Sequence, residues 1–332
     1  MRPFEYLRVD EDALAVQANA SGDTAFLAGG TTLLDLMKLD VMRPEAVVDI
    51  NGLAQRHGQI RIDDQGLHLG ALAHMGEVAD HAEIRKSYPV IAQSLQLAAS
   101  QQIRNMATLG GNVLQRTRCS YFRDPRWSTC NKRNPGSGCA AWEGVNRKHA
   151  VLGGAPDCIA TYPGDFAQAL VALDAEVEIL GPKGPRVIRF EDLHRLPGKT
   201  PEMETNLAAR ELITGFRVPA GAWTRRSLYL KVRDRESYEF ALASAAVALD
   251  LDGETVRDAR IALGGVATKP WRAHEAERVL TGQALDEASA QHAASLAFAA
   301  GTPAPNGGNA YKVELGRRTL VRALLDAAKM EV

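Results

Sequence analysis

The cysteines restrict the fold of this 332-residue chain more than any other sequence feature. All four lie in one short stretch, at Cys119, Cys130, Cys139 and Cys158. The surrounding residues, about 115–160, are rich in Arg, Gly and Pro and carry few periodic hydrophobic residues, so we expect an irregular insertion. Because such a loop lacks a hydrophobic core, a group bound by the cysteines could hold it in place.

The cysteine spacing is compatible with a [4Fe–4S] cluster, a structural zinc ion, two disulfides or free thiols. Zinc sites generally use closely spaced cysteine pairs, whereas the gaps here are ten, eight and eighteen residues. Disulfides need an oxidising compartment during folding, and the N-terminal residues show no export signal. Four thiolates in an arginine-rich loop suit an iron–sulfur cluster, whose negative charge is offset by nearby cations. Spacing alone leaves the cluster and zinc open.

Alternating strand and helix patterns predict an α/β fold outside this insertion. A small unit over residues 1–57 precedes a larger one over 58–221, and residues 89–101 are expected to form one helix. Pro and Gly at 218–221 mark the best domain boundary. Beyond it, residues 222–332 show three strand patterns and then three helices, which predicts a separate C-terminal α/β domain.

Composition excludes several classes of function. The formal charge of −1 gives no general basic field for nucleic acid, and no window approaches the roughly 20 apolar residues of a membrane-spanning helix. We therefore expect neither nucleic-acid binding nor direct membrane insertion. The sequence shows no Gly-x-Ser-x-Gly motif and no His-x-x-x-His pair, so it offers no nucleophile or metal-hydrolase signature.

Two glycine pairs are the candidate cofactor loops. Ala28-Gly29-Gly30-Thr31-Thr32 joins an expected strand to an expected helix, and Thr108-Leu109-Gly110-Gly111-Asn112 follows a helical stretch. Paired glycines let backbone N–H groups approach a phosphate without interference from a Cβ atom. Each motif alone could be an ordinary tight turn. Neither has the G-x-G-x-x-G form of a dinucleotide site, which disfavours a nicotinamide dehydrogenase.

The two motifs together resemble those of FAD-binding subunits of molybdenum hydroxylases, the group of xanthine dehydrogenase and carbon monoxide dehydrogenase. Stretches such as Leu-Gln-Arg-Thr-Arg-Cys and Gly-Ser-Gly-Cys-Ala-Ala look closest to the FAD- and iron–sulfur-bearing subunit of bacterial periplasmic aldehyde oxidoreductases. The resemblance covers nearly the whole chain. It implies a two-lobed PCMH-type FAD-binding module over 1–221, followed by a domain of the CO dehydrogenase flavoprotein type over 222–332.

The resemblance also implies roles for individual residues. The four cysteines would hold a [4Fe–4S] cluster. Asp165 would hydrogen-bond FAD, although it could also be a helix N-cap, and Lys231 would approach the flavin ring, although a lysine in a strand is more often solvated. Tyr238 is either near the flavin or a core aromatic. The residues expected around FAD are Leu27, Ala28, Gly29, Gly30, Thr31, Thr32, Leu33, Leu34, Thr108, Gly111, Asn112, Asp165, Ile213 and Lys231.

The function implied is electron transfer within a molybdenum aldehyde oxidoreductase that converts aldehydes to carboxylic acids. A large molybdopterin subunit would oxidise the aldehyde, and a small [2Fe–2S] subunit would pass electrons to FAD here and on to an external acceptor. The alternative is a stand-alone FAD oxidase or reductase, which would need a catalytic base beside the flavin. The resemblance suggests a periplasmic location by co-export with a signal-bearing partner, whereas the N-terminal residues alone suggest the cytoplasm.

Overall fold

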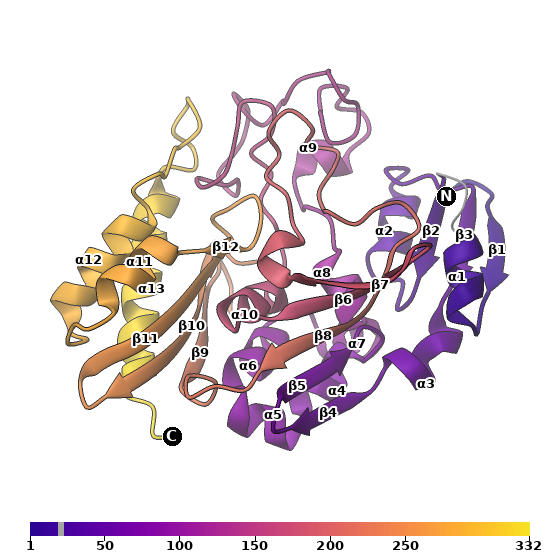
Figure 1. The fold of residues 1–332 in the computed structure, drawn as a ribbon. Helices are drawn as coiled ribbons and strands as arrows, with labels where there is room; N and C mark the ends of the chain where they lie inside the picture. The colour runs from indigo at the N-terminus through magenta and orange to yellow at the C-terminus, as the bar shows by residue number, and fades with distance from the viewer. Residues whose placement is uncertain (19–22) are drawn as a thin grey trace.

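Figure 1 shows three β-sheets with helices packed between and around them, in a computed structural model that describes residues 1–18 and 23–332. The N-terminal sheet is parallel, with strand order β1-β3-β2. All four residues of β1 are exposed, so this strand lacks the alternation by which sequence reveals strands, and it was not predicted. The elements of this lobe are β1 (Glu5–Arg8), α1 (Asp12–Ala18), β2 (Thr24–Leu27), α2 (Leu33–Lys38), β3 (Ala46–Asp49), η1 (Asn51–Leu53) and α3 (Ala54–His57).

The central sheet is antiparallel, with strand order β4-β5-β8-β6-β7. Its buried face carries Leu69, Val177 and Phe216, which pack in one core with Leu95 and Phe166 of the neighbouring helices. The elements are β4 (Ile60–Asp63), β5 (Gly66–Gly70), α4 (Met75–Asp80), α5 (Ala82–Ser87), α6 (Pro89–Gln96), α7 (Gln101–Met106), α8 (Leu109–Val113), α10 (Phe166–Ala172), β6 (Glu176–Gly181), β7 (Gly184–Arg189), η2 (Phe190–Asp192) and β8 (Leu212–Pro219).

The third sheet, with order β12-β11-β10-β9, is the predicted C-terminal α/β unit. Its strand β10 is buried on both faces: Val247 and Leu249 pack against the C-terminal helices, whereas Ala246 and Ala248 belong to the core shared with the central sheet. Small alanines on that second face let α6 and α10 approach closely. The elements are β9 (Ser227–Val232), β10 (Ala243–Asp252), β11 (Thr255–Gly264), β12 (Trp271–Arg272), α11 (His274–Leu280), α12 (Glu287–Ala297) and α13 (Tyr311–Ala328).

The helix expected over 89–101 is interrupted. The chain forms α6, breaks at Ala99, whose φ is +49°, and starts again as α7 behind Ser100, whose hydroxyl accepts the N–H of Ile103. The break frees backbone carbonyls that side chains then use: Lys231 donates to Leu97 O (3.0 Å). Tertiary partners therefore override a locally favourable helix pattern.

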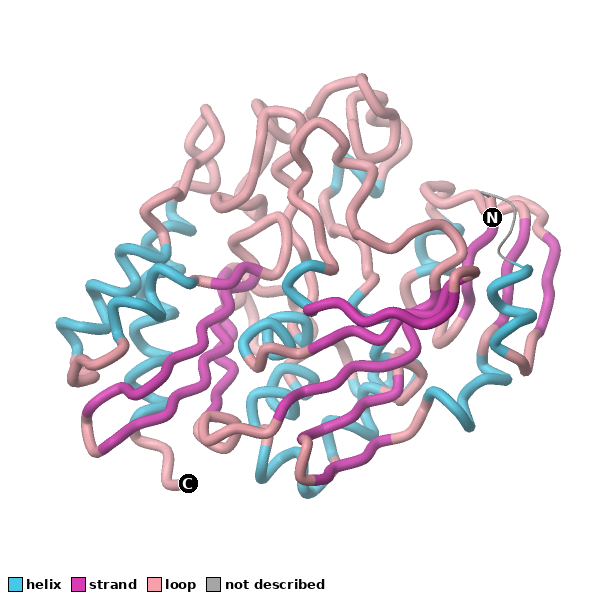
Figure 2. The backbone as a smooth tube through the Cα atoms, in the orientation of Figure 1, coloured by secondary structure: helices cyan, strands magenta, loops and turns pink. Residues whose placement is uncertain are grey.

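The cysteine-bearing stretch is irregular, as predicted, except for the short helix α9 (Ser120–Arg123). Figure 2 shows it among the loops gathered at the top of the molecule. The start of α13 ties it down. The Lys312 side chain is fully buried, and its Nζ donates to the carbonyl oxygens of Lys148 (3.1 Å), His149 (3.2 Å) and Gly265 (2.6 Å). Burial lowers the pKa of Lys312 to about 7.

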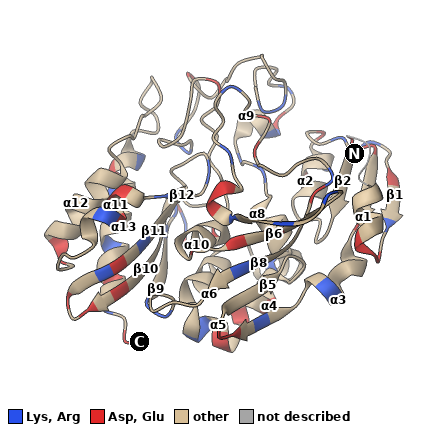
Figure 3. Ribbon diagram, viewed as in Figure 1, with Lys and Arg blue, Asp and Glu red and all other residues tan. Residues whose placement is uncertain are grey.

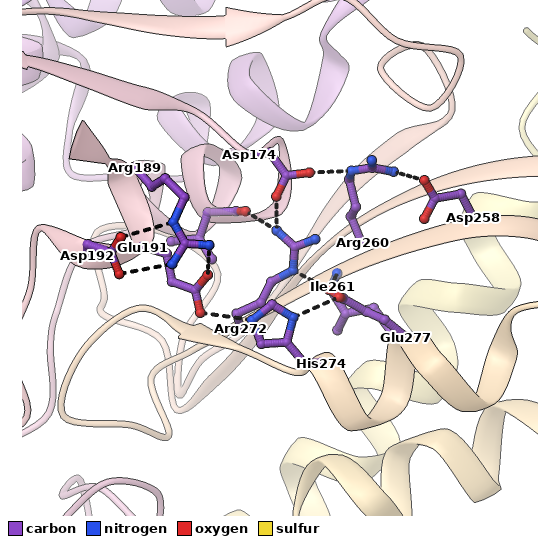
Figure 4. A network of polar contacts seen from close by, with 11 residues as sticks. Asp174, Arg189, Glu191, Asp192, Asp258, Arg260, Ile261, Arg272, His274 and Glu277 are labelled. Carbon is purple, nitrogen blue, oxygen red and sulfur yellow. Dashed lines mark hydrogen bonds and ion pairs between the residues drawn. The ribbon is translucent and has the colours of Figure 1, made fainter. Parts of the chain in front are cut away.

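A network of ion pairs joins the C-terminal unit to the central sheet, as Figure 4 shows. Asp174, which follows α10, accepts from Arg260 of β11 and Arg272 of β12, each at 2.6 Å. Arg272 is nearly buried and also pairs with Glu277 of α11. At the other end of the network, Arg189 of β7 contacts Glu191 (4.0 Å), which pairs with His274 of α11 (3.0 Å). Because the network reaches from β7 of the central sheet to β11 of the third sheet, it helps to fix the relative position of the two sheets.

Charged side chains of both signs are interspersed over the outer strands and helices (Figure 3). In the part of the chain that the structure describes, no helix combines the length and the apolar character needed to span a bilayer.

Candidate functional site

Two cavities meet at the loop between β2 and α2 and together form a trough. One, called here the Ile213 cavity, has a volume of about 330 Å³ and extends toward Ile213 on β8. The other, the Lys231 cavity, has about 500 Å³ and extends toward Lys231 on β9. Thr31 and Thr32 line both. The arrangement suits an extended ligand lying across the loop.

The structure brings together nearly all of the residues expected around FAD. Leu27 and Leu34 line neither cavity and instead pack against Gly30. A Cβ atom on Gly30 would lie 3.2 Å from Cδ1 of Leu27 and 3.0 Å from Cδ1 of Leu34. Asn112, Asp165 and Lys231 line the Lys231 cavity. The Ile213 cavity is lined by Ala28, Gly29, Gly30, Thr31, Thr32, Leu33, Thr108, Gly111 and Ile213.

The first glycine loop can pass between other parts of the chain only because it lacks side chains. A Cβ atom at Gly29 would lie 1.9 Å from Met106 O, and Gly30 has a φ of +72° that L-residues rarely adopt. Thr32 is the N-cap residue of α2, but its hydroxyl does not cap the helix. That hydroxyl lies on the wall of both cavities, where it could hydrogen-bond a ligand.

The second glycine loop also lines both cavities, with Thr108 and Gly111 in the Ile213 cavity and Asn112 in the Lys231 cavity. Thr108 is committed locally, because its hydroxyl accepts the N–H of Gly111 (3.3 Å) and caps α8. Asn112 donates its amide to Met75 Sδ (3.3 Å), which leaves its Oδ1 buried without a partner. Because Asn112 lines the Lys231 cavity, this unpartnered oxygen is a candidate acceptor for an N–H or O–H of a bound cofactor.

Asp165 and Lys231 form a buried ion pair at the far end of the trough. Lys231 Nζ lies 2.7 Å from Asp165 Oδ2, and their side chains are 1% and 5% exposed. Tyr229 donates its hydroxyl to the other carboxylate oxygen at 2.6 Å. The expectation of a solvated Lys231 is therefore wrong. Asp165 is the N-cap residue of α10 by position, as expected, but its side chain makes no capping hydrogen bond.

The Asp165 pair changes the electrostatics expected for Lys231. An isolated cation beside a flavin would favour its anionic reduced form, but here the carboxylate of Asp165 balances the ammonium charge. Burial raises the pKa of Tyr229 well above its usual value, and the neighbouring Asp165 adds to that shift. The cluster therefore holds Tyr229 behind the cavity wall as a neutral donor to Asp165, and Asp165 compensates the charge of Lys231.

The four carboxylates that line the described part of the trough are all paired with cations. Besides Asp165, these are Asp35 with Arg118 and Arg123, Glu211 with Arg186, and Glu239 with Lys148. The oxygens of these carboxylates are thus already engaged by cations and are not free to contact a substrate proton. The trough therefore suits cofactor binding better than proton abstraction from a substrate.

Tyr238 lies at the rim of the Lys231 cavity and is 54% exposed, so the core-aromatic interpretation is wrong. It adopts a φ of +52°, and the Arg235 guanidinium lies 5.9 Å from its ring centroid. Phe240 lines the same cavity, with the guanidinium of Arg118 5.0 Å from its ring centroid. Two aromatic rings backed by arginines thus border this end of the trough.

All four cysteines line one small cavity in the insertion. None of them forms a disulfide. His149 Nε2 lies 3.2 Å from the sulfur of Cys119, and the N–H of Ala160 donates to the sulfur of Cys158 (3.4 Å). Across residues 1–18 and 23–332, no three His, Cys, Asp or Glu side chains are arranged as ligands of a metal ion.

Burial keeps two of these thiols protonated. It raises the pKa of Cys119 to about 12 and that of Cys158 to about 11, although Lys132 partly opposes the shift at Cys158. A thiol must lose its proton to bind a metal, so a bound group would have to supply compensating positive charge. Two small apolar clusters surround the cysteines, one around Tyr121 and Ala141 and one around Leu36 and Phe122.

Comparison with known proteins identifies the family. Residues 2–221 match the family described as the FAD binding domain in molybdopterin dehydrogenase, and residues 228–327 match the CO dehydrogenase flavoprotein C-terminal domain. The chain belongs to the FAD-binding subunits of the molybdenum hydroxylases. The mixed α/β architecture predicted from sequence, an FAD-binding module followed by this C-terminal domain, is confirmed.

Individual relatives match over nearly the whole chain. The FAD-binding subunit PaoB of an aldehyde oxidoreductase from Escherichia coli is 44% identical over 98% of this chain and 99% of its own length. The carbon monoxide dehydrogenase medium chain of Afipia carboxidovorans is 28% identical over 92% and 88%. Among solved structures, carbon monoxide dehydrogenase from Hydrogenophaga pseudoflava has a TM-score of 0.76 at 27% identity, covering 99% of this chain and 98% of that one.

Sequence reasoning missed several residues of the site in this family member. Tyr229 precedes Lys231 by two positions on β9, so the two-residue period of a strand places both on one face, and that signal could have found it. Arg118 and Arg123 line the trough from within the cysteine-bearing insertion. Arg116 also lines the trough. Its pairing with Glu204, which lies outside the trough, carries no local signal, because the two residues are 88 positions apart.

Proposed function

We propose that this chain is the FAD-carrying electron-transfer subunit of a heteromeric, molybdenum-dependent aldehyde oxidoreductase. It would receive electrons from a [2Fe–2S] subunit and pass them through FAD to an external acceptor. The observation that carries the proposal is the 44% identity over almost the full length to the FAD-binding subunit of an aldehyde oxidoreductase. Bound FAD supplies the redox chemistry, since a flavin can accept electrons singly and deliver them in pairs.

The trough residues fit such a cofactor. The glycine loop and Thr32 would hold the pyrophosphate, and the unpartnered Asn112 Oδ1 would accept a hydrogen bond from FAD. Ile213 and its apolar neighbours would contact one end of the cofactor. At the other end, Lys231 and Tyr229 would be held in fixed positions by Asp165.

The alternative is a stand-alone FAD oxidase or reductase with its own substrate. Such an enzyme would need a catalytic base beside the flavin. The pairing of Asp35, Asp165, Glu211 and Glu239 with cations argues against a free carboxylate base in the trough. Glu239 is the weakest of these cases, because its distance to Lys148 is 3.4 Å.

We also propose that the four cysteines hold a [4Fe–4S] cluster. Support comes from their shared cavity, the absence of disulfides among them, and Lys132 on the cavity wall, whose charge would offset that of a cluster. The thiolates of a cubane bind separate corners and lie farther apart than the ligands of one zinc ion. The gaps of ten, eight and eighteen residues between the cysteines also lack the closely spaced pairs of most zinc sites.

A structural role for this cluster is favoured over an electron relay, because the insertion has only small apolar clusters of its own to hold it in place. A Cys139→Ser variant tests the role. Faster proteolysis of the insertion, with unchanged turnover per bound FAD, would support the structural role. Normal FAD loading with slowed turnover would support the relay.

The partners we propose are a large molybdopterin-binding subunit and a small [2Fe–2S] subunit, and the acceptor is a small molecule or carrier protein outside the complex. We further propose a periplasmic location by co-export with a signal-bearing partner, on the strength of the resemblance to periplasmic aldehyde oxidoreductases. Fractionation of cells that express all three chains would distinguish this from the cytoplasmic alternative.

The experiment that tests the proposed function is purification of the tagged chain from cells, with its partners co-expressed, and quantification of flavin and metals. About one FAD per complex, and about four irons beyond those of the co-purified [2Fe–2S] subunit, would support it. Flavin with only the irons of the [2Fe–2S] subunit would refute the cluster and leave the FAD-subunit role intact. A colourless chain that binds no FAD and no partner would refute the whole proposal.

A further inference from the structure

Two carboxylates from outside the insertion bind its cations in pairs. Asp35 of α2 accepts from Arg118 (3.3 Å) and Arg123 (2.8 Å). Glu204, in the loop before β8, accepts from Arg116 at 2.9 and 3.0 Å and from Lys132 at 3.1 Å. These four cations flank Cys119 and Cys130 in sequence. Glu204 thus ties together two segments of the cysteine-bearing insertion, whereas Asp35 holds the segment around α9.

The same groups reach the FAD trough. Arg116 lines the Ile213 cavity, whereas Asp35, Arg118 and Arg123 line the Lys231 cavity. Lys132 lines neither of these two cavities but lines the cysteine cavity. Glu204 therefore joins a cation on the trough wall to a cation on the cysteine side, while its own side chain lines neither cavity.

Apolar packing runs parallel to these ion pairs. The guanidinium of Arg116 lies over the ring of Phe122, 4.5 Å from its centroid. Phe122 is fully buried and packs with Leu36 of α2 and with Cys130. Because α2 begins directly after the first glycine loop, that loop rests on the insertion through this cluster.

Glu204, Arg116 and Lys132 form a partly buried cluster, called here the Glu204 cluster. The side chain of Glu204 is 23% exposed, that of Arg116 is 24% exposed and that of Lys132 is 11% exposed. Burial works against its ionisation, but Arg116 and Lys132 outweigh that effect and hold the pKa of Glu204 below its usual value. Partly buried, charge-assisted hydrogen bonds of this kind fix positions more firmly than exposed pairs.

We propose that Glu204 is a positioning residue that couples the cysteine cavity to the FAD trough, so that loss of a cysteine ligand weakens FAD binding through Lys132, Glu204 and Arg116. The inference rests on the proposed function in taking FAD as the ligand of the trough. When the segment around the cysteine cavity becomes less ordered, Lys132 changes position and its ion pair with Glu204 weakens. Glu204 then no longer fixes Arg116 on the wall of the Ile213 cavity. The coupling is reciprocal, so bound FAD also stabilises the cysteine side.

A double-mutant cycle on the full-length chain tests this. The dissociation constant for FAD is measured by fluorescence quenching of the flavin-free protein for wild type, C139S, E204Q and C139S/E204Q. We expect C139S to weaken FAD binding about tenfold in the wild-type background, within the usual range for coupled sites. In the E204Q background, C139S should change the FAD affinity less than about twofold, because the link is already broken.

The matched control is D192N, which removes the charge of an acid in an exposed ion pair with Arg189 away from both cavities. C139S should weaken FAD binding as much in D192N as in wild type. If E204Q fails to fold by circular dichroism, K132M breaks the same link from the cysteine side and replaces it in the cycle. Effects of C139S and E204Q that multiply, or a C139S variant with wild-type FAD affinity, would overturn the coupling.

The outcomes also separate this inference from the proposed function. Wild-type chain that does not bind FAD would refute the FAD-subunit role itself. Wild-type chain that binds FAD but contains no iron would refute the cluster, and the cycle would still report whether Cys139 and Glu204 are coupled.

Discussion

Replacing Asp165 by Asn should destabilise the protein by several kcal/mol. The side chain of Lys231 is 1% exposed, and Asp165 is its carboxylate partner at 2.7 Å. D165N keeps the size of the side chain but leaves the ammonium buried without a counter-charge. Breaking a buried ion pair by removing one partner typically costs about 3–5 kcal/mol. The remaining bond from Lys231 to Leu97 O favours the lower end, about 3 kcal/mol.

The companion variant D165N/K231M separates loss of charge balance from loss of packing. The second substitution also removes the unpaired ammonium of Lys231. The double variant should therefore be less destabilised than D165N alone, even though it carries one more substitution. The assay is urea unfolding at pH 7, followed by circular dichroism, together with the FAD content of the purified variants. D165N within about 1 kcal/mol of wild type, or a double variant less stable than D165N, would refute the buried-pair reasoning.

Three further predictions concern other parts of the molecule. Burial lowers the pKa of His194 from 6.5 to about 4, so neutral His194 stabilises the fold fully above pH 6.5, and about 3 kcal/mol of that stabilisation is lost as the pH falls to 4. The urea midpoint of H194Q should therefore fall less steeply between pH 7 and pH 4 than that of the wild type. D174N should weaken the pairs with Arg260 and Arg272 and lower the unfolding free energy by about 1–2 kcal/mol, and an unchanged urea midpoint would contradict the network's role. K312M should leave three backbone carbonyl oxygens without their donor and lower the free energy of unfolding by more than about 2 kcal/mol. It should also speed proteolysis of the insertion, and a wild-type cleavage rate would contradict this.

Much of the architecture follows from local sequence signals. The glycine loops, the three C-terminal strands and the helices after them were predictable because each has a short-range pattern of turn residues or hydrophobic periodicity. The strand β1 was not, since all four of its residues are exposed. The helix over 89–101 was predicted whole, and the break at Ala99 reflects side-chain partners from elsewhere in the chain.

The sequence by itself determined that the four cysteines share one irregular segment and that two glycine loops are candidates for binding a cofactor. Only the tertiary structure decided which charges meet. Asp165 and Lys231 are 66 residues apart, and Asp35 and Arg118 are 83 apart. No local pattern links such pairs, because the packing of whole elements brings them together. Once they are buried, the cost of an unpaired charge makes each partner indispensable to the other.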